Sequence, residues 1–541
     1  MRSKLRFILW ILAGILLAGN IVLTETANAA RKPEGEVIIA LQSLETQMWT
    51  PYLGASLPML SLLTGVYESL LEHGPNSDEL RPMLAERWTV SPDGKTYDFY
   101  LRKGIQFHGG WGEFTAEDVK FSIELTMAEG SKATRAGQFR QLGVKAEAVD
   151  NYHVRISLKR PCAEWLWMMS TWMVDLPILS KQYSKAVGNE KAGEQPVGTG
   201  PYKFVEQKIG DYLKLEALET HWRLVPYYKK MTFRIVPEPR TALAMIQRGE
   251  ADFAPIPLNM AKEVKATRVK QLVTPDCGQM LVHFGGMYVP EVAKEKYDPA
   301  CPWVPFNNQR ARKVRLALEM AIDKEAIRQR ILLGYARPQV LTSFAADSIY
   351  SDPSWKIIPY DPAKAKEVLT EAGYPRGFEK PITMWKMVMP GREEVEDVAE
   401  AVAQYWERNL GLNVKRRVIE YGPVKAAWRD RSDAWICYTY RWQGPYPEPY
   451  MLATRNGLLT TGNTVFGMDP RIDEICNRID GEPSAEKRVL LNRQFGQIWY
   501  DGRSTIPIGL VDSIYVVSNK ISQWDRRPKT SVVHNLEYLK P

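Results

Sequence analysis

Cysteine and histidine are scarce in this chain, and neither residue type forms a recognisable metal or redox motif. The five cysteines include no C-x-x-C pair, and no two of the six histidines stand four residues apart. This spacing excludes the usual zinc sites and a thioredoxin-like centre, while a metal chelate held by a single histidine stays open. One or two disulfides also stay open, and the odd count leaves at least one thiol unpaired within a monomer.

Motifs of the common hydrolases and nucleotide-binding enzymes are absent too. The chain has no G-x-S-x-G, no H-E-x-x-H, no G-x-x-x-x-G-K and no G-x-G-x-x-G. The adjacent acids Glu393 and Glu394 fall in a segment with the pattern of a solvated helix face, so they are weak candidates for a glycosidase pair. We therefore expect no catalytic residues and no cofactor.

Long apolar runs are missing except at the N-terminus. There, Arg2, Lys4 and Arg6 precede an apolar stretch over 7–17, and Ala27-Asn28-Ala29 follows as a small-x-small sequence. This order predicts a cleaved secretory signal peptide over 1–29, with an uncleaved membrane anchor as the alternative. No cysteine lies near the junction to carry a lipid. We expect a periplasmic protein that is exported by a cleaved signal peptide and is not lipid-anchored.

Charge is balanced and dispersed. The chain has 71 basic and 63 acidic side chains, a net charge of +8, without a long basic tract. Nucleic acid is therefore not expected as a partner. Seventeen tryptophans and twenty-five tyrosines are available, in part, to line a cleft for a ring-shaped ligand.

Strands and helices alternate along the chain, which predicts an α/β architecture. A hairpin is expected over 87–101 around Ser91-Pro92-Asp93-Gly94. Thr115 and Asp118 form a capping box at the start of a helix. The stretch 393–410 places Val395, Val398, Val402 and Trp406 on one helical face before Gly411. The length of the chain calls for more than one domain.

Several sequence blocks occur in the order found in the dipeptide-, oligopeptide- and nickel-binding proteins of ABC importers. The longest is LAERWTVSPDGKTYDFYLRKGIQFHGGWGEFTAEDVKFSI, and the others are VYESL, PVGTGPYKFV, ALAMIQRGEADF, RLALEMAIDKEAI and DPAKAKEVLTEAGY. The chain resembles this family of extracellular solute-binding proteins. A longer turn at 109–112 is a small departure.

The resemblance implies a two-lobed periplasmic binding protein fold with a hinge and an extra subdomain on lobe I. The expected division is lobe I at 31–58, 193–288 and 506–541, its subdomain at 59–192, and lobe II at 289–505. The chain is expected to cross between the lobes near 283–288 and 504–507, where Gly or Pro allows rotation.

The function implied is capture of a small solute in the cleft between the lobes and its delivery to an ABC permease with cytoplasmic ATPases. The solute is expected to be peptide-like, a saccharide or opine-like, and the protein is expected to be a monomer that closes around it. Two alternatives are an exported hydrolase and a periplasmic interaction or chaperone protein on the same scaffold.

Two segments are expected to reach the cleft: a loop of lobe I and the strand that crosses between the lobes. The loop after the first strand presents Glu45, Gln47 and Trp49. In the strand over 279–284, alternation places Gln279 and His283 on one face, and the sequence does not decide which face lines the cleft.

The third segment surrounds Trp442. Peptide-binding relatives have a tryptophan here and, three residues later, an aspartate that pairs with the peptide ammonium group; this chain has Pro445 instead. Glu448 is a candidate replacement, but the loss favours a solute other than a simple peptide. Trp385, Tyr440, Trp442 and Tyr446 are candidates for stacking on a sugar or opine. Arg392 and Arg441 are candidates for binding a carboxylate or phosphate.

Overall fold

The computed structural model describes residues 31–541 except for 56, 75–78, 173, 265–268, 346, 390, 457–458, 461–466 and 526–532. The predicted signal peptide at 1–29 lies outside the described residues. Within the described part of the chain, no helix has the length and apolarity needed to cross a membrane.

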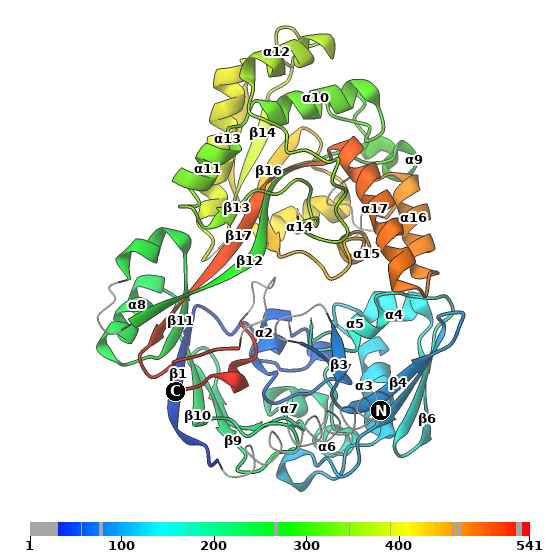
Figure 1. Cartoon of the computed structure of the whole chain (residues 1–541), viewed down its shortest axis with the longest axis vertical. Coiled ribbons are helices and arrows are strands. Elements are labelled where there is room, and N and C mark those ends of the chain that lie inside the picture. Colours follow the sequence, from blue (N-terminus) through cyan, green and yellow to red (C-terminus); the bar gives the residue numbers. More distant parts are fainter. Residues whose placement is uncertain are drawn as a thin grey trace, which may run out of the picture.

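Two lobes lie one above the other, joined by two long strands (Figure 1). In lobe I, helix α8 packs against β11 and against the C-terminal strand β17 (Thr505–Ser518). Its elements are α2 (Leu57–Leu62), α8 (Pro239–Arg248), β1 (Glu34–Leu41), β8 (Tyr202–Lys208), β9 (Tyr212–Ala217), β10 (Tyr228–Ile235) and β11 (Phe253–Ile256).

The subdomain lies beside lobe I and contains two small antiparallel sheets, β2-β3 and β4-β5-β7-β6. Its strands are β2 (Leu71–His73), β3 (Leu80–Pro82), β4 (Ala85–Val90), β5 (Thr96–Leu101), β6 (Lys145–Asp150) and β7 (His153–Ser157). Its helices are α3 (Ala116–Met127), α4 (Ala136–Leu142), α5 (Trp165–Met168), α6 (Lys181–Val187) and α7 (Asn189–Glu194).

Lobe II has helices on both faces of its strands (Figure 1). The strands are β13 (Ala336–Arg337), β14 (Ile382–Val388), β15 (Val414–Glu420) and β16 (Ile436–Gln443). The helices are α9 (Pro290–Ala293), α10 (Gln309–Met320), α11 (Lys324–Arg330), α12 (Pro362–Glu371), α13 (Glu394–Leu410), α14 (Tyr421–Asp430), α15 (Met451–Asn456), α16 (Pro470–Asp480) and α17 (Ala485–Gly502).

One sheet runs through both lobes in the order β15-β14-β16-β12-β17-β11-β1-β10-β9-β8, with β13 paired to β17. Strands β12 (Val269–Phe284) and β17 (Thr505–Ser518) are antiparallel and belong to both lobes. Parallel pairs such as β1-β10 and β14-β15 coexist with antiparallel ones. The predicted α/β class is confirmed.

The chain passes between the lobes at an interruption in the pairing of β12 with β17. Thr274 pairs with Ser513 and Gly278 with Val511, so three residues of β12 face Asp512 alone. Asp276, in this bulge, has a left-handed backbone with φ of 57°. A bulge of this kind bends a strand locally without ending the sheet.

This crossing lies upstream of the predicted 283–288 segment and downstream of 504–507. Residues on the far side of the bulge pair with β16, so they belong to lobe II. Gly285 and Gly286, which suggested flexibility, instead allow close packing. A β-carbon at Gly285 would lie 2.2 Å from the carbonyl oxygen of Asp433, and one at Gly286 would lie 2.9 Å from Cα of Ala434.

The local elements predicted from sequence patterns form as expected. Strands β4 and β5 make the predicted hairpin, and Thr115 with Asp118 forms the predicted capping box of α3. The apolar stripe of α13 is fully buried, and Gly411 ends the helix with φ of 67°.

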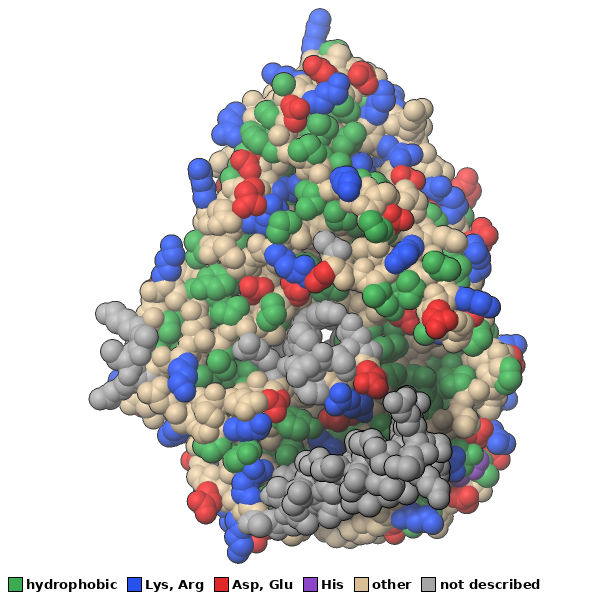
Figure 2. Space-filling model, viewed as in Figure 1, with side chains coloured by type: hydrophobic (Ala, Val, Ile, Leu, Met, Phe, Trp, Pro, Cys, Tyr) green, Lys and Arg blue, Asp and Glu red, His purple; other side chains and the backbone are tan. Residues whose placement is uncertain are grey.

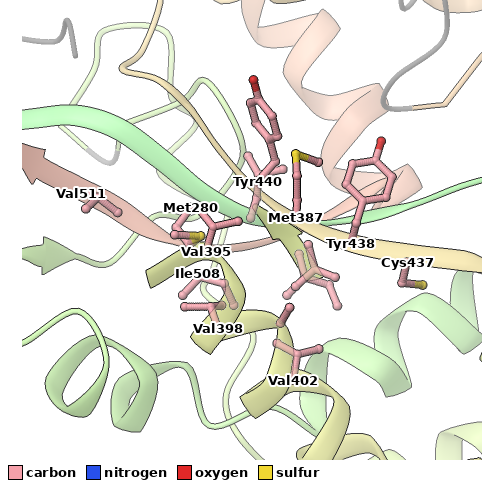
Figure 3. Close-up of a cluster of buried hydrophobic side chains, with 14 of the residues drawn as sticks. Met280, Met387, Val395, Val398, Val402, Cys437, Tyr438, Tyr440, Ile508 and Val511 are labelled. Carbon is pink, nitrogen blue, oxygen red and sulfur yellow. The ribbon is translucent and has the colours of Figure 1, made fainter. Parts of the chain in front are cut away.

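The sheet of lobe II has buried side chains on both of its faces. Val395 and Val398 of α13 pack under the sheet with Met280 and Ile508, whereas Tyr438 and Tyr440 of β16 point to the opposite side (Figure 3). All five cysteines are buried and unpaired, so no disulfide contributes.

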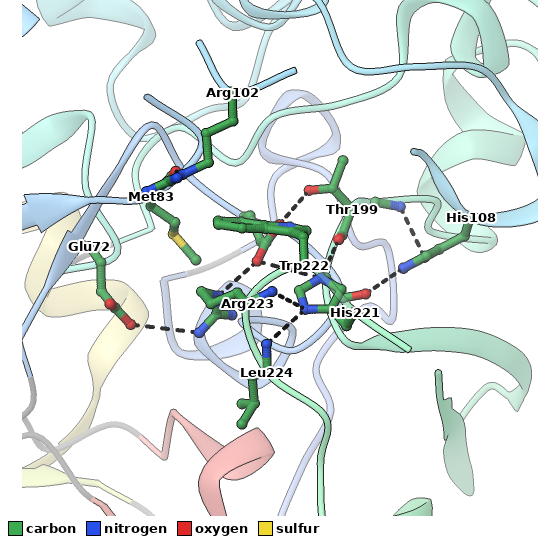
Figure 4. A network of polar contacts seen from close by, with 12 residues as sticks. Glu72, Met83, Arg102, His108, Thr199, His221, Trp222, Arg223 and Leu224 are labelled. Carbon is green, nitrogen blue, oxygen red and sulfur yellow. Dashed lines mark hydrogen bonds and ion pairs between the residues drawn. The ribbon is translucent and has the colours of Figure 1, made fainter. Parts of the chain in front are cut away.

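A buried ion pair joins the subdomain to lobe I (Figure 4). Glu68 is fully buried and accepts hydrogen bonds from Arg223 Nε (2.9 Å), Trp222 Nε1 (3.0 Å) and Thr199 Oγ1 (2.9 Å). Nearby, the buried His108 and His221 rings bond to backbone oxygens of Gly200 and Thr199, at 2.7 and 2.8 Å. Burial lowers the pKa of each histidine to about 4.

Candidate ligand-binding site

A cavity of about 370 Å³ lies between the lobes beside the crossing strands. Lobe I contributes the loop after β1, α2, the end of β11 and part of β17, and lobe II contributes two arginines and a glycine. The lining residues are Leu41, Gln42, Ser43, Glu45, Met59, Leu62, Pro255, Ile256, Pro257, Leu258, Gly391, Arg392, Arg441, Ser513, Ile514, Tyr515 and Val533. The molecular surface is hollowed between the lobes, with hydrophobic side chains in the hollow (Figure 2).

The lobe I wall is the loop that follows β1. The side chains of Gln47 and Trp49 in this loop are fully buried and do not line the cavity. Gln47 Oε1 accepts a hydrogen bond from the Gly210 amide at 2.6 Å, and Trp49 Nε1 donates to Gln207 Oε1 at 2.8 Å. Both predicted contacts therefore anchor the loop to the β8-β9 hairpin. Glu45 and two residues that the sequence did not single out, Gln42 and Ser43, line the cavity.

The lobe II wall is formed by Arg392 and Arg441, both predicted from the sequence. Arg392 Nη1 donates to the Arg441 carbonyl at 2.8 Å. Burial, and then the neighbouring charge of Arg441, lower the pKa of Arg392. Arg441 forms a buried ion pair with Glu394, with 2.7 Å between Nη1 and Oε1. The lobe II wall thus carries two arginines, of which Arg441 is paired with Glu394, and it faces a mainly apolar lobe I wall that also carries Glu45.

Tyr440 and Trp442 lie on the face of β16 opposite to Arg441, and Trp385 lies on the neighbouring strand β14. Trp385 is 4% exposed and Tyr440 7%, and both belong to the core of lobe II. Trp442 is half-buried, and its Nε1 lies 3.1 Å from His283 Nε2. His283 is fully buried and stacks on Tyr438 with ring centroids 4.8 Å apart.

Two further predicted residues have partners within the protein. Gln279 is fully buried, and its Oε1 accepts hydrogen bonds from Gln339 Nε2 (2.7 Å) and the Ser343 amide (2.6 Å). Glu448 is 4% exposed and pairs with Arg488 at 2.9 Å. Because that carboxylate is already neutralised, Glu448 gains no support as a replacement for the missing aspartate.

The lobes also touch on the far side of the cleft from the crossing. Tyr446 of lobe II packs on Trp172 of the subdomain, with ring centroids 5.5 Å apart. Asp480 Oδ2 pairs with Arg160 Nη1 at 3.0 Å, and Asp480 Oδ1 accepts from the Ala163 amide at 3.1 Å. The structure therefore holds the lobes in contact.

Metal-binding groups are not gathered anywhere in the part of the chain that the structure describes. No three His, Cys, Asp or Glu side chains there are placed to hold an ion together.

Comparison with known families identifies the chain. The family described as bacterial extracellular solute-binding proteins, family 5 (middle), matches residues 79–462. The chain belongs to this family. The predicted membership is confirmed, as is the predicted capture of a solute.

Individual family 5 relatives bind different solutes. The chain is 29% identical over 471 residues to heme-binding protein A of Haemophilus influenzae, covering 82% of this chain and 81% of that protein. It is 30% identical over 436 residues to the glutathione-binding protein GsiB of Pectobacterium atrosepticum, covering 77% and 78%.

A solved structure shows the shared fold. The ABC transporter-associated periplasmic binding protein DppA from Helicobacter pylori, in complex with the peptide STSA, superposes with a TM-score of 0.74. The two chains are 23% identical, and the match covers 94% of this chain and 98% of that one. The predicted two-lobed fold is confirmed.

Proposed function

We propose that this protein binds a small solute carrying at least one anionic group, in the cavity between the loop after β1 and Arg392, and passes it unchanged to an ABC permease. The observation that carries the proposal is the meeting of the two lobes at this cavity. Leu41 and Ile256 offer apolar surface from lobe I, while Arg392 offers positive charge from lobe II. Binding sites of this kind combine apolar walls with a few polar groups that orient the ligand.

Electrostatics favour an anion over a cation or a neutral solute. A lowered pKa means that the surroundings of Arg392 disfavour its charged form. A carboxylate or phosphate oxygen beside the guanidinium offsets that cost, and a planar carboxylate accepts two parallel hydrogen bonds from it.

We still expect a peptide-like, saccharide or opine-like solute, and among these we expect one that carries a carboxylate or phosphate group. Pro445 and the pairing of Glu448 with Arg488 remove the usual partner of a peptide ammonium group from the segment after Trp442. A glutathione-binding relative supports an acidic peptide conjugate. None of the predicted aromatic candidates is among the residues that line this cavity, whose aromatic lining residue is Tyr515.

The remaining features follow from the same role. We infer a periplasmic protein, exported by cleavage after residue 29, free of a lipid anchor, monomeric and without affinity for nucleic acid. It performs no chemistry on its solute. The permease and its ATPases supply the energy for import.

Native mass spectrometry of the protein purified from its host tests the proposal first, because retained solute is identified without a prior guess. Isothermal titration then compares reduced glutathione, an opine, a disaccharide and a neutral-capped tripeptide. We expect an acidic solute to be retained and to be released intact on unfolding.

The matched variants are Arg392→Gln and the exposed Arg240→Gln. Loss of a buried charge pair predicts at least about 30-fold weaker binding for Arg392→Gln, which corresponds to ~2 kcal/mol. Arg240 has an exposed side chain (71%), so its variant should bind like the parent. Retention of a neutral or cationic solute, or equal affinity in both variants, contradicts the proposal.

A further inference from the structure

Arg441 reaches across three strands at the point where the chain passes between the lobes. It stands on β16 opposite Met280 of β12, and its side chain runs back over Gly278. A β-carbon at Gly278 would lie 2.6 Å from Nε and 3.0 Å from Cγ of Arg441. The glycine is therefore the residue that lets this side chain pass over β12.

The guanidinium ends on β17 beside the bulge. Its Nη2 donates to the Asp512 carbonyl at 2.7 Å and to Ser513 Oγ at 3.2 Å. Asp512 is the residue that faces the bulge, and Ser513 is the first paired residue on the lobe I side. The other Nη atom is fixed to Glu394 in the first turn of α13, so both Nη atoms are committed to protein groups.

We propose that Arg441 is a positioning residue that fastens the two crossing strands in the arrangement where the lobes touch, rather than a direct solute contact. Rotation of the lobes about the bulge moves Asp512 and Ser513 relative to β16. The hydrogen bonds of Arg441 to both residues fit one hinge setting, and opening separates them.

The solute is coupled to this fastening through Arg392, a step that rests on the proposed function. Arg392 donates to the carbonyl oxygen of Arg441 itself. A solute that draws the Arg392 guanidinium toward the cavity thereby acts on the residue that holds the hinge. Differential affinity for the two hinge settings is what allows a ligand to shift their populations.

Interlobe distance in the absence of added solute tests the fastening independently of solute identity. Spin labels at Glu147→Cys on β6 and Lys487→Cys on α17 report the separation on the far side of the cleft, since both sites are exposed. The five native thiols are buried, so labelling is selective in the folded protein. The protein is unfolded and refolded before labelling to remove retained solute.

Three substitutions loosen the fastening in different ways. Arg441→Met removes the guanidinium, Gly278→Ala displaces it while keeping its charge, and Ser513→Ala removes only one hydrogen bond. Gly137→Ala is the matched control, because a β-carbon there meets nothing within 4 Å. We expect longer mean distances in the first two variants, a smaller shift in Ser513→Ala and none in Gly137→Ala.

Solute affinity separates the two proposals. If the closed population falls to a tenth, apparent affinity for the retained solute falls about tenfold. Unchanged distances in Gly278→Ala and Ser513→Ala overturn the hinge role, even if Arg441→Met fails to fold. Shifted distances with unaltered binding in Arg392→Gln would leave the hinge role standing and refute the proposed anion site.

Discussion

Glu68 and Asp480 are two buried carboxylates with the same kinds of partner in different places. Glu68 has an arginine, an indole N–H and a hydroxyl, from Arg223, Trp222 and Thr199. Asp480 has Arg160, a backbone N–H from Ala163 and the hydroxyl of Tyr450 at 3.1 Å. The first set lies within lobe I and its subdomain, whereas the second connects the subdomain to lobe II.

The difference lies in how fully each cation is removed from water. The Arg223 side chain is 12% exposed and that of Arg160 is 46% exposed. Water competes with the partly exposed pair and weakens it. An arginine, an N–H group and a hydroxyl therefore make a permanent joint at Glu68 and a contact that can separate at Asp480.

The largest effect is expected from breaking the permanent joint. Arg223→Met leaves Glu68 buried without its cation, which should lower the free energy of unfolding by about 3–5 kcal/mol. Urea denaturation measures this loss. Arg248→Met, at a side chain that is 58% exposed, should change stability by less than about 0.5 kcal/mol. A loss in Arg223→Met as small as that in Arg248→Met would show that the Glu68 ion pair contributes little to stability.

Acid pH should lower folding stability through the two histidines near the Glu68 ion pair. The histidines His108 and His221 have pKa values of about 4 in the folded protein, below their ordinary 6.5. The unfolded chain therefore binds more protons as pH falls through 6.5, and folding stability decreases. Each histidine should remove on the order of 1–2 kcal/mol between pH 6.5 and pH 5. The difference between the parent and His221→Gln across this range isolates one contribution, and a constant difference would contradict the assignment.

A smaller effect is expected at the separable contact. Arg160→Met should lower the free energy of unfolding by less than about 1 kcal/mol, because the ion pair is partly hydrated. It should nevertheless lengthen the interlobe distance between the labels at 147 and 487. Arg155→Met is the control, since that arginine is similarly exposed (44%) but pairs with Asp98 inside the subdomain. A large stability loss without a distance change would place Arg160 among the permanent joints.

The sequence predicted features that depend on neighbours along the chain. The stripe of α13 from Val395 to Trp406 is a local pattern, and so is the Thr115 capping box. The resemblance added the two-lobed arrangement. Arg392 was predicted by residue type and position, and it lines the cavity.

Other features depend on partners remote in sequence. Gln47 and Trp49 were predicted as ligand contacts, but residues near 207–212 bind them from the β8-β9 hairpin. Glycines at 285 and 286 suggested a hinge, whereas tight packing against 433–434 explains them. Tyr440 faces the core because side chains alternate along β16, so that it points away from the side of Arg441, and Trp385 of the neighbouring β14 lies in the same core. None of these partners leaves a local signal.

Because one sheet continues through both lobes, opening of the lobes must bend paired strands. β12 and β17 remain paired on each side of the bulge, so the lobes are joined by a two-stranded ribbon rather than by free linkers. Opening bends this ribbon, and its stiffness opposes large excursions. Amide exchange in this ribbon should accordingly be fastest at the bulge that contains Asp276, where the longer of its two register shifts occurs.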